Sequence, residues 1–73
     1  MTTYRAYQIK AEDTKDTDLH GRWCVLGKDD THYIRSTGEG LTLRTQDLAY
    51  YLLGCKTYKT KQTAQKIANA KNG

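Results

Sequence analysis

Seventy-three residues leave this chain room for one small hydrophobic core and little else. A chain of this length buries roughly 60% of the surface that its unfolded form exposes, so its stability is marginal. Small domains often compensate with disulfides, a metal ion or self-association. The two cysteines, Cys24 and Cys55, are too few for a secreted disulfide scaffold. We therefore predict a single domain, residues 1–73, with reduced thiols and no enclosed active-site cleft.

The apolar residues predict neither a signal peptide nor a membrane span. The first ten residues, MTTYRAYQIK, lack the apolar core of a signal peptide. The densest apolar run, LAYYLLGC (48–55), is far shorter than the ~20 apolar residues that cross a bilayer. We expect a cytoplasmic protein that does not associate with a membrane.

The first half of the chain has the pattern of an antiparallel meander. Turn-forming residues occur at 28–30 (KDD) and 37–40 (TGEG). The polar segment 11–21 predicts a loop, and its length leaves the pairing of the first two strands open. Runs rich in β-branched and aromatic residues predict strands over 3–10, 22–27 and 31–36, with a possible short fourth strand over 41–44.

The alternation within these strands predicts two different faces. If Ile9, Val25 and Ile34 point to the core, an opposite face carries Tyr4, Lys10, Arg22, Tyr33 and Arg35. Tyrosines and arginines on an open sheet face can stack bases or dock a protein. We therefore take Tyr33 and Arg35 as candidate partner-binding residues. The alternative is that the tyrosines only cover the sheet or pack under the helices.

Two helices are predicted in the second half. For the first, over 46–53, Thr45 has the chemistry of an N-cap and Gly54 stands at the C′ position. A buried strand over the same residues is the alternative, because LAYYLL is apolar on all sides. The second helix, over 61–71, follows the candidate N-cap Thr60. We predict an α+β fold, in which both helices pack on one face of a three- or four-stranded antiparallel sheet.

Positive charge is concentrated in the C-terminal quarter of the chain. The formal net charge is +4, yet residues 55–73 contain five lysines and no acid. Three of these lysines flank Tyr58 at the start of the second helix, where backbone amides also attract phosphate. The alternative is that the lysines only solvate the outer face of a helix. The predicted site for a protein or nucleic acid with an anionic surface is Lys56, Tyr58, Lys59, Lys61 and Lys66.

The segment TKQTAQKIANA (60–70) resembles the last helix of double-stranded-RNA-binding domains, which contacts phosphates. The matching residues are Thr60, Lys61, Ala64 and Ala68. Residues 43–54 depart from the order of that family, and we do not assign the chain to it.

No motif predicts catalysis, a metal or a cofactor. Asp16 and Asp18 have the spacing of a calcium loop, but His20 and Gly27 stand where further ligands are required. The cysteines and histidines lack the close spacing of zinc ligands. Neither a phosphate-binding loop nor a nucleophile paired with a base is present.

We therefore predict a small non-enzymatic binding protein that acts by occupying a surface. In size and composition the chain loosely resembles accessory proteins of bacteriophages and mobile elements, anti-CRISPR proteins among them. That resemblance implies inhibition or regulation of a host nucleic-acid-handling machine. The alternative is direct binding of DNA or RNA through the lysines, and a homo-oligomeric component is a third possibility.

Overall fold

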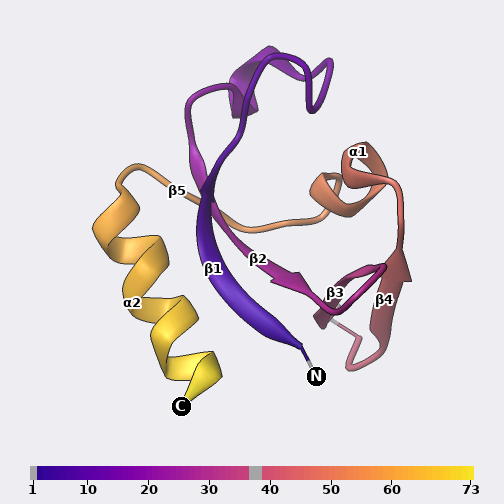
Figure 1. Ribbon diagram of the computed structural model, residues 1–73. Helices are drawn as coiled ribbons and strands as arrows, with labels where there is room; N and C mark the ends of the chain where they lie inside the picture. The colour runs from indigo at the N-terminus through magenta and orange to yellow at the C-terminus, as the bar shows by residue number, and fades with distance from the viewer. Residues whose placement is uncertain (1, 37–38) are drawn as a thin grey trace.

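The computed structural model describes residues 2–36 and 39–73, and within them an antiparallel sheet is combined with two α-helices (Figure 1). This confirms the predicted α+β class. Part of the predicted turn at 37–40 lies outside the described residues. The strands are β1 (Thr3–Gln8), β2 (Trp23–Lys28), β3 (Tyr33–Ser36), β4 (Thr42–Thr45) and β5 (Thr57–Tyr58), and the helices are α1 (Leu48–Leu52) and α2 (Lys61–Asn72).

The first four strands form the predicted meander, in the order β1-β2-β3-β4. β1 and β2 pair along their whole length, from Thr3 opposite Lys28 to Gln8 opposite Trp23. The polar segment between them, which contains a short 3-10 helix (Thr17–Leu19), is therefore a long connection that leaves their pairing intact. After the first helix, β5 pairs with β2 and adds a fifth strand to the described part of the sheet.

The second edge of β2 is covered in three consecutive parts. β5 pairs with its first two residues, and β3 pairs with it, among the described residues, at Lys28 alone. Between them, the hydroxyl of Tyr51 accepts a hydrogen bond from the N–H of Gly27 at 3.0 Å. The same oxygen lies 3.4 Å from the carbonyl oxygen of Val25 and 3.2 Å from that of Ile34. A side chain thus fills the gap where β3 diverges from β2.

The main core lies between α1 and one face of the sheet. Tyr51 and Leu52 of α1 are at most 1% exposed, and they pack with Ile9, Cys24 and Leu26. Cys24 is fully buried and packs as a small apolar side chain. Burial of these side chains removes apolar surface from water, which is the main favourable contribution to the stability of the fold.

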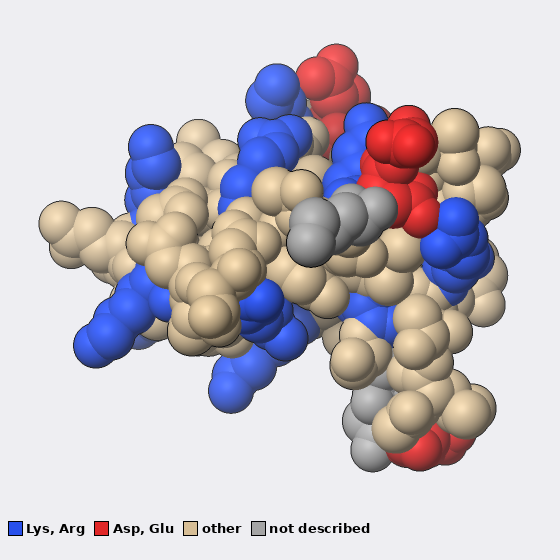
Figure 2. Space-filling model, turned by 60° about the horizontal axis from the view of Figure 1, so that its bottom comes forward, with Lys and Arg blue, Asp and Glu red and all other residues tan. Residues whose placement is uncertain are grey.

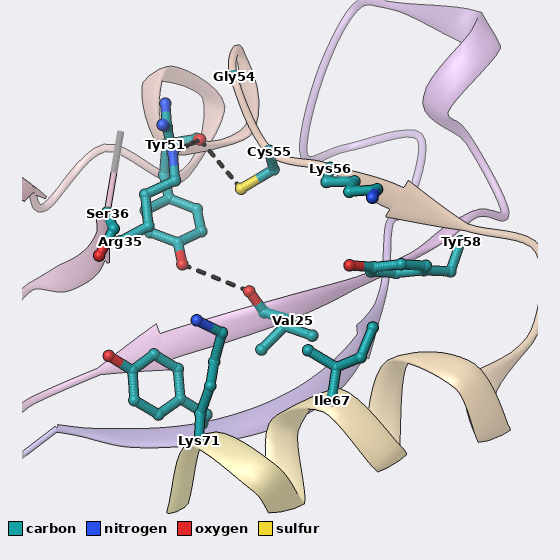
Figure 3. Close-up of a pocket in the computed structure, with 11 residues that line it drawn as sticks. Val25, Arg35, Ser36, Tyr51, Gly54, Cys55, Lys56, Tyr58, Ile67 and Lys71 are labelled. Atoms are coloured by element: carbon teal, nitrogen blue, oxygen red, sulfur yellow. Dashed lines mark hydrogen bonds between the residues drawn. The ribbon is translucent and has the colours of Figure 1, made fainter. Parts of the chain in front are cut away.

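α2 lies on the opposite face of β1 and β2 from α1 (Figure 1). Ala64 and Ala68 are fully buried, so their small side chains let the helix approach the strands closely. Val25 of β2 points towards Ile67 of α2 (Figure 3). The prediction that both helices pack on one face was wrong. The reason is that β2 is apolar on both faces, so each face requires its own cover.

The outer edge of β1 pairs with side chains of α2 instead of a strand. The side-chain amide of Asn72 donates to the carbonyl oxygen of Tyr4 at 2.7 Å and accepts from its N–H at 2.8 Å. The side-chain oxygen of Gln65 accepts from the N–H of Ala6 at 3.3 Å. These side-chain amides make hydrogen bonds that the backbone of a neighbouring strand would otherwise make.

The helix starts follow local capping chemistry. α2 begins as predicted after Thr60, whose hydroxyl accepts from the N–H of Thr63 at 3.3 Å. Residues 48–52 are helical, which excludes the buried-strand alternative for them. The N-cap of α1 is Asp47, whose carboxylate accepts from the N–H of Ala49 at 3.0 Å. The predicted cap, Thr45, is instead the last residue of β4, where it pairs with the backbone of β3.

Candidate functional site

A pocket of about 240 Å³ opens at the place where β3 diverges from β2 (Figure 3). Val25 of β2 and Ile67 of α2 supply apolar surface within it. None of the described residues that line it is acidic. Its remaining large side chains are three cations and three tyrosines, namely Arg35, Lys56, Lys71, Tyr4, Tyr51 and Tyr58.

Arg35 is held at one side of this pocket by the backbone of α1. Its Nε donates a hydrogen bond to the carbonyl oxygen of Tyr51 at 3.0 Å, and its guanidinium carbon lies 5.6 Å from the centre of the Tyr51 ring. Gly54 makes room for this arrangement, because a Cβ there would lie 2.7 Å from a guanidinium nitrogen. The Arg35 cation is therefore positioned before any ligand arrives, which lowers the entropic cost of binding.

Two lysines of the pocket lie against tyrosine rings. The Nζ of Lys71 is 5.4 Å from the centre of the Tyr4 ring, and the Nζ of Lys56 is 6.0 Å from the centre of the Tyr58 ring. Both distances are within the range of cation–π attraction. Both lysines are solvent-exposed, so their charges are available to a ligand at the rim of the pocket.

The predicted lysines do not form one cluster. Lys56 lines the pocket, whereas the Nζ of Lys61 lies 6.0 Å from the ring of Trp23. Lys66 is two residues from each of the buried Ala64 and Ala68, so helix geometry places it on the outward face of α2. Lys59 is exposed in the connection between β5 and α2. In Figure 2, blue side chains occur over the whole visible face, whereas the left half, where α2 lies, shows no red side chains.

Tyr33 does not lie on an open face. It is half-buried, and its ring centre lies 5.6 Å from that of the buried Tyr51. The prediction that it faces away from the core was therefore wrong, because β3 turns this side chain towards α1. Of the two candidate residues on this strand, only Arg35 lines the pocket.

The structure adds residues to the candidate site that the sequence analysis did not include. Lys71 enters the pocket wall because it is four residues after Ile67 and therefore lies on the same side of α2. That spacing was readable from the sequence. Tyr4 enters because its ring packs over Gly27, where an added Cβ would lie 2.6 Å from a ring carbon. No sequence signal predicts that contact.

Neither thiol has the properties of a nucleophile. Burial raises the pKa of Cys24 to about 12. Burial also raises the pKa of Cys55 to about 11, although the Arg35 charge acts in the opposite direction. Both thiols are therefore protonated at neutral pH, and the reactive form of cysteine is the thiolate.

Among residues 2–36 and 39–73, no group of three or more His, Cys, Asp or Glu is placed to hold a metal ion. In the same part of the chain, no helix is long and apolar enough to cross a membrane.

A second, wider hollow of about 750 Å³ lies between the polar connection after β1 and helix α1. Its lining includes residues 11–16 and Asp47, which contribute four carboxylates and one lysine. Two exposed apolar side chains of this region, Tyr50 and Leu53, are 53% and 79% exposed. The acidic hollow is thus separate from the cationic pocket beside α2.

No protein-family model, curated protein or solved structure matches this chain. Its function therefore has to be inferred from its own residues.

Proposed function

We propose that this protein is a non-enzymatic module that binds single-stranded nucleic acid on the surface formed by α2, β5 and the adjoining pocket. The observation that carries the proposal is that lysines of the segment 55–73, which contains no acidic residue, lie against aromatic rings. Three of its lysines each lie within 6.0 Å of a ring centre, namely Lys56 at Tyr58, Lys61 at Trp23 and Lys71 at Tyr4.

This combination suits the chemistry of a single strand. Ammonium groups bind phosphates and release condensed counterions, which favours association at low salt. Aromatic rings stack with unpaired bases, and each stacked base contributes ~1–3 kcal/mol with little dependence on sequence. Alternating cations and rings therefore support binding to the backbone and the bases of one strand together.

The test is the salt dependence of binding to a fluorescein-labelled thymidine oligonucleotide. The variant carries Lys56→Gln, Lys61→Gln and Lys71→Gln, and the matched control carries Lys10→Gln, Lys15→Gln and Arg44→Gln. Both lose the same formal charge. We expect the slope of log K against log salt to become shallower by about 2 in the variant only, because each single-strand phosphate contact contributes roughly 0.7. Equal slopes in the variant and the control would contradict the proposal.

Occlusion of a nucleic-acid-handling protein is the second candidate function, and the exposed Tyr50 and Leu53 favour it. Contiguous exposed apolar side chains often mark protein interaction sites. In this candidate the lysines face an acidic protein surface of a host nucleic-acid-handling machine. Affinity purification with and without nuclease separates the two. Occlusion is supported if protein partners remain bound after nuclease treatment and are lost in the double variant Tyr50→Ser, Leu53→Ser. Loss of all partners on nuclease treatment opposes it.

A further inference from the structure

We propose that the pocket beside α2 seats one unstacked nucleobase of the bound strand, with Tyr58 as the stacking ring. In this arrangement Arg35 and Lys71 contact the phosphates on either side of that nucleotide. The inference rests on the proposed function, but it assigns a separate task to the pocket: the surface lysines hold the backbone, and the pocket recognises a base.

The size and the lining of the pocket determine what it can accept. Its volume of about 240 Å³ is below the roughly 300–1,000 Å³ of sites for drug-sized ligands. Val25 and Ile67 offer apolar contacts to a flat ring. A single planar heterocycle fits this description, whereas a folded peptide segment or several stacked bases require more space.

Tyr58 is the tyrosine whose position suits stacking. The Tyr51 ring is fully buried between Arg35 and Tyr33, and the Tyr4 ring packs between Gly27 and Lys71. The Tyr51 ring therefore has no open face for a base, and one face of the Tyr4 ring is closed by Gly27. Tyr58 is half-buried, and its hydroxyl end points into the pocket in Figure 3.

The cations border the pocket from different elements. Arg35 belongs to β3, Lys56 immediately precedes β5, and Lys71 belongs to α2. A nucleotide whose base enters between them carries its phosphates to the rim, where these charges lie. Because none of the described lining residues is acidic, no carboxylate repels those phosphates.

The pocket also implies a preference for single strands over duplexes. A base inside a duplex is stacked and paired, and it must be extruded before it can enter a snug pocket. A single strand does not bear the full cost of unpairing. We therefore expect binding to depend on the presence of accessible bases as well as on the number of phosphates.

The experiment compares three labelled probes of equal phosphate number by fluorescence anisotropy: a thymidine oligonucleotide of roughly ten nucleotides, an abasic strand of the same length, and a hairpin duplex. We expect the wild-type protein to bind the thymidine strand about tenfold more tightly than the abasic strand, as one stacked base requires. We expect the affinity for the duplex to be no higher than that for the abasic strand.

Three variants test the assignment of Tyr58. Tyr58→Leu is expected to abolish the preference for the thymidine strand over the abasic strand. Tyr58→Phe retains a ring and is expected to keep the preference. Tyr50→Leu removes an exposed tyrosine on α1, away from the pocket, and serves as the matched control that keeps the preference. Thermal unfolding of each variant verifies that it is folded.

The outcomes distinguish this inference from the proposed function. Equal, salt-dependent binding of the wild-type protein to thymidine and abasic strands would overturn the base pocket and leave the backbone-binding surface standing. Absence of binding to all three probes would overturn both. A preference that persists in Tyr58→Leu would overturn the role of Tyr58.

Discussion

The hydroxyl oxygen of Tyr51 lies 3.0 Å from the backbone nitrogen of Gly27, although 24 residues separate them in the chain. This contact joins α1 to the penultimate residue of β2, at the point where β3 diverges. One phenol therefore completes the sheet beside the pocket, and the same residue offers its carbonyl oxygen to Arg35 at 3.0 Å. The pocket wall and the core thus depend on a common side chain.

Replacing Tyr51 with Phe is expected to lower the free energy of unfolding by about 1–3 kcal/mol, because the buried N–H of Gly27 loses its acceptor. Urea denaturation followed by tryptophan fluorescence measures the change through the single Trp23. Tyr50→Phe is the matched control, since Tyr50 is 53% exposed and its substitution should be nearly neutral. If both variants unfold at the same urea concentration, the hydroxyl of Tyr51 has no structural role.

Gly27 and Gly54 are expected to respond differently to alanine. At Gly27 an added Cβ would lie 2.3 Å from the carbonyl oxygen of Ile34, so the backbone must move, and the free energy of unfolding should fall by about 3 kcal/mol or more. At Gly54 an added Cβ would meet the far end of the flexible Arg35 side chain, and the free energy of unfolding should change by no more than about 0.5 kcal/mol. Thermal unfolding of the two variants compares these costs, and equal costs would refute the steric explanation.

The same Gly54→Ala change is expected to weaken nucleic-acid binding while the fold is retained. It displaces the Arg35 guanidinium from the pocket wall, and the affinity for a single strand should fall roughly three- to tenfold, as for loss of one hydrogen-bonding group. A double-mutant cycle with Arg35→Gln provides the check. If Gly54→Ala still weakens binding by the same factor in the Arg35→Gln background, its effect does not act through Arg35.

The alanines beneath α2 are expected to tolerate no larger side chain. Ala64→Leu or Ala68→Leu forces the helix away from the strands, with an expected loss of about 1–3 kcal/mol. Ala70→Leu adds the same atoms to an exposed position of the same helix and should change stability by no more than about 0.5 kcal/mol. Urea midpoints of the three variants measure the contrast, which disappears if α2 is only loosely packed.

Stability is expected to fall in alkaline solution. Burial raises the pKa of Cys24 from 9.0 to about 12, and that of Tyr51 from 10.0 to about 12. Between those values the unfolded chain has released protons that the folded chain still holds, so the free energy of unfolding decreases as pH rises. The contribution of Cys24 is complete below its unfolded pKa of 9.0.

Urea midpoints measured between about pH 7 and pH 10 test this dependence. Cys24→Ala should lower stability at neutral pH through the loss of packing, yet reduce the decline with pH. An identical decline in both proteins would exclude the Cys24 thiol as its source.

Local signals in the sequence predicted most of the elements. The four-residue spacing of Ala64 and Ala68 and the N-cap Thr60 are local signals that define α2. The predicted bounds of this helix therefore agree with the structure to one residue. The start of α1 was predicted two residues too early, because Thr45 was taken as the N-cap and the observed cap is Asp47. Thr45 pairs instead with Tyr33 in the sheet, and that pairing is not visible in a local pattern.

The arrangement of the helices and of the site depends on contacts between distant residues. The alternation in β2 assigns Val25 and Leu26 to opposite faces, but it does not say which helix covers which face. Similarly, the lysine-rich segment predicted a cationic surface, whereas the pocket requires Arg35 and Lys71, which are far apart in the sequence. Lys66 lies on the outward face of α2 and therefore does not line the pocket, although its neighbour in the chain, Ile67, does.

The pairing of Asn72 and Gln65 with the edge of β1 has a consequence for behaviour at high concentration. An unpaired edge strand can pair with other chains and so start the growth of fibrils. The side-chain amides of Gln65 and Asn72 block this edge by occupying its backbone hydrogen-bonding groups. Truncation before Asn72 is therefore expected to turn a clear solution into one that stains with an amyloid dye.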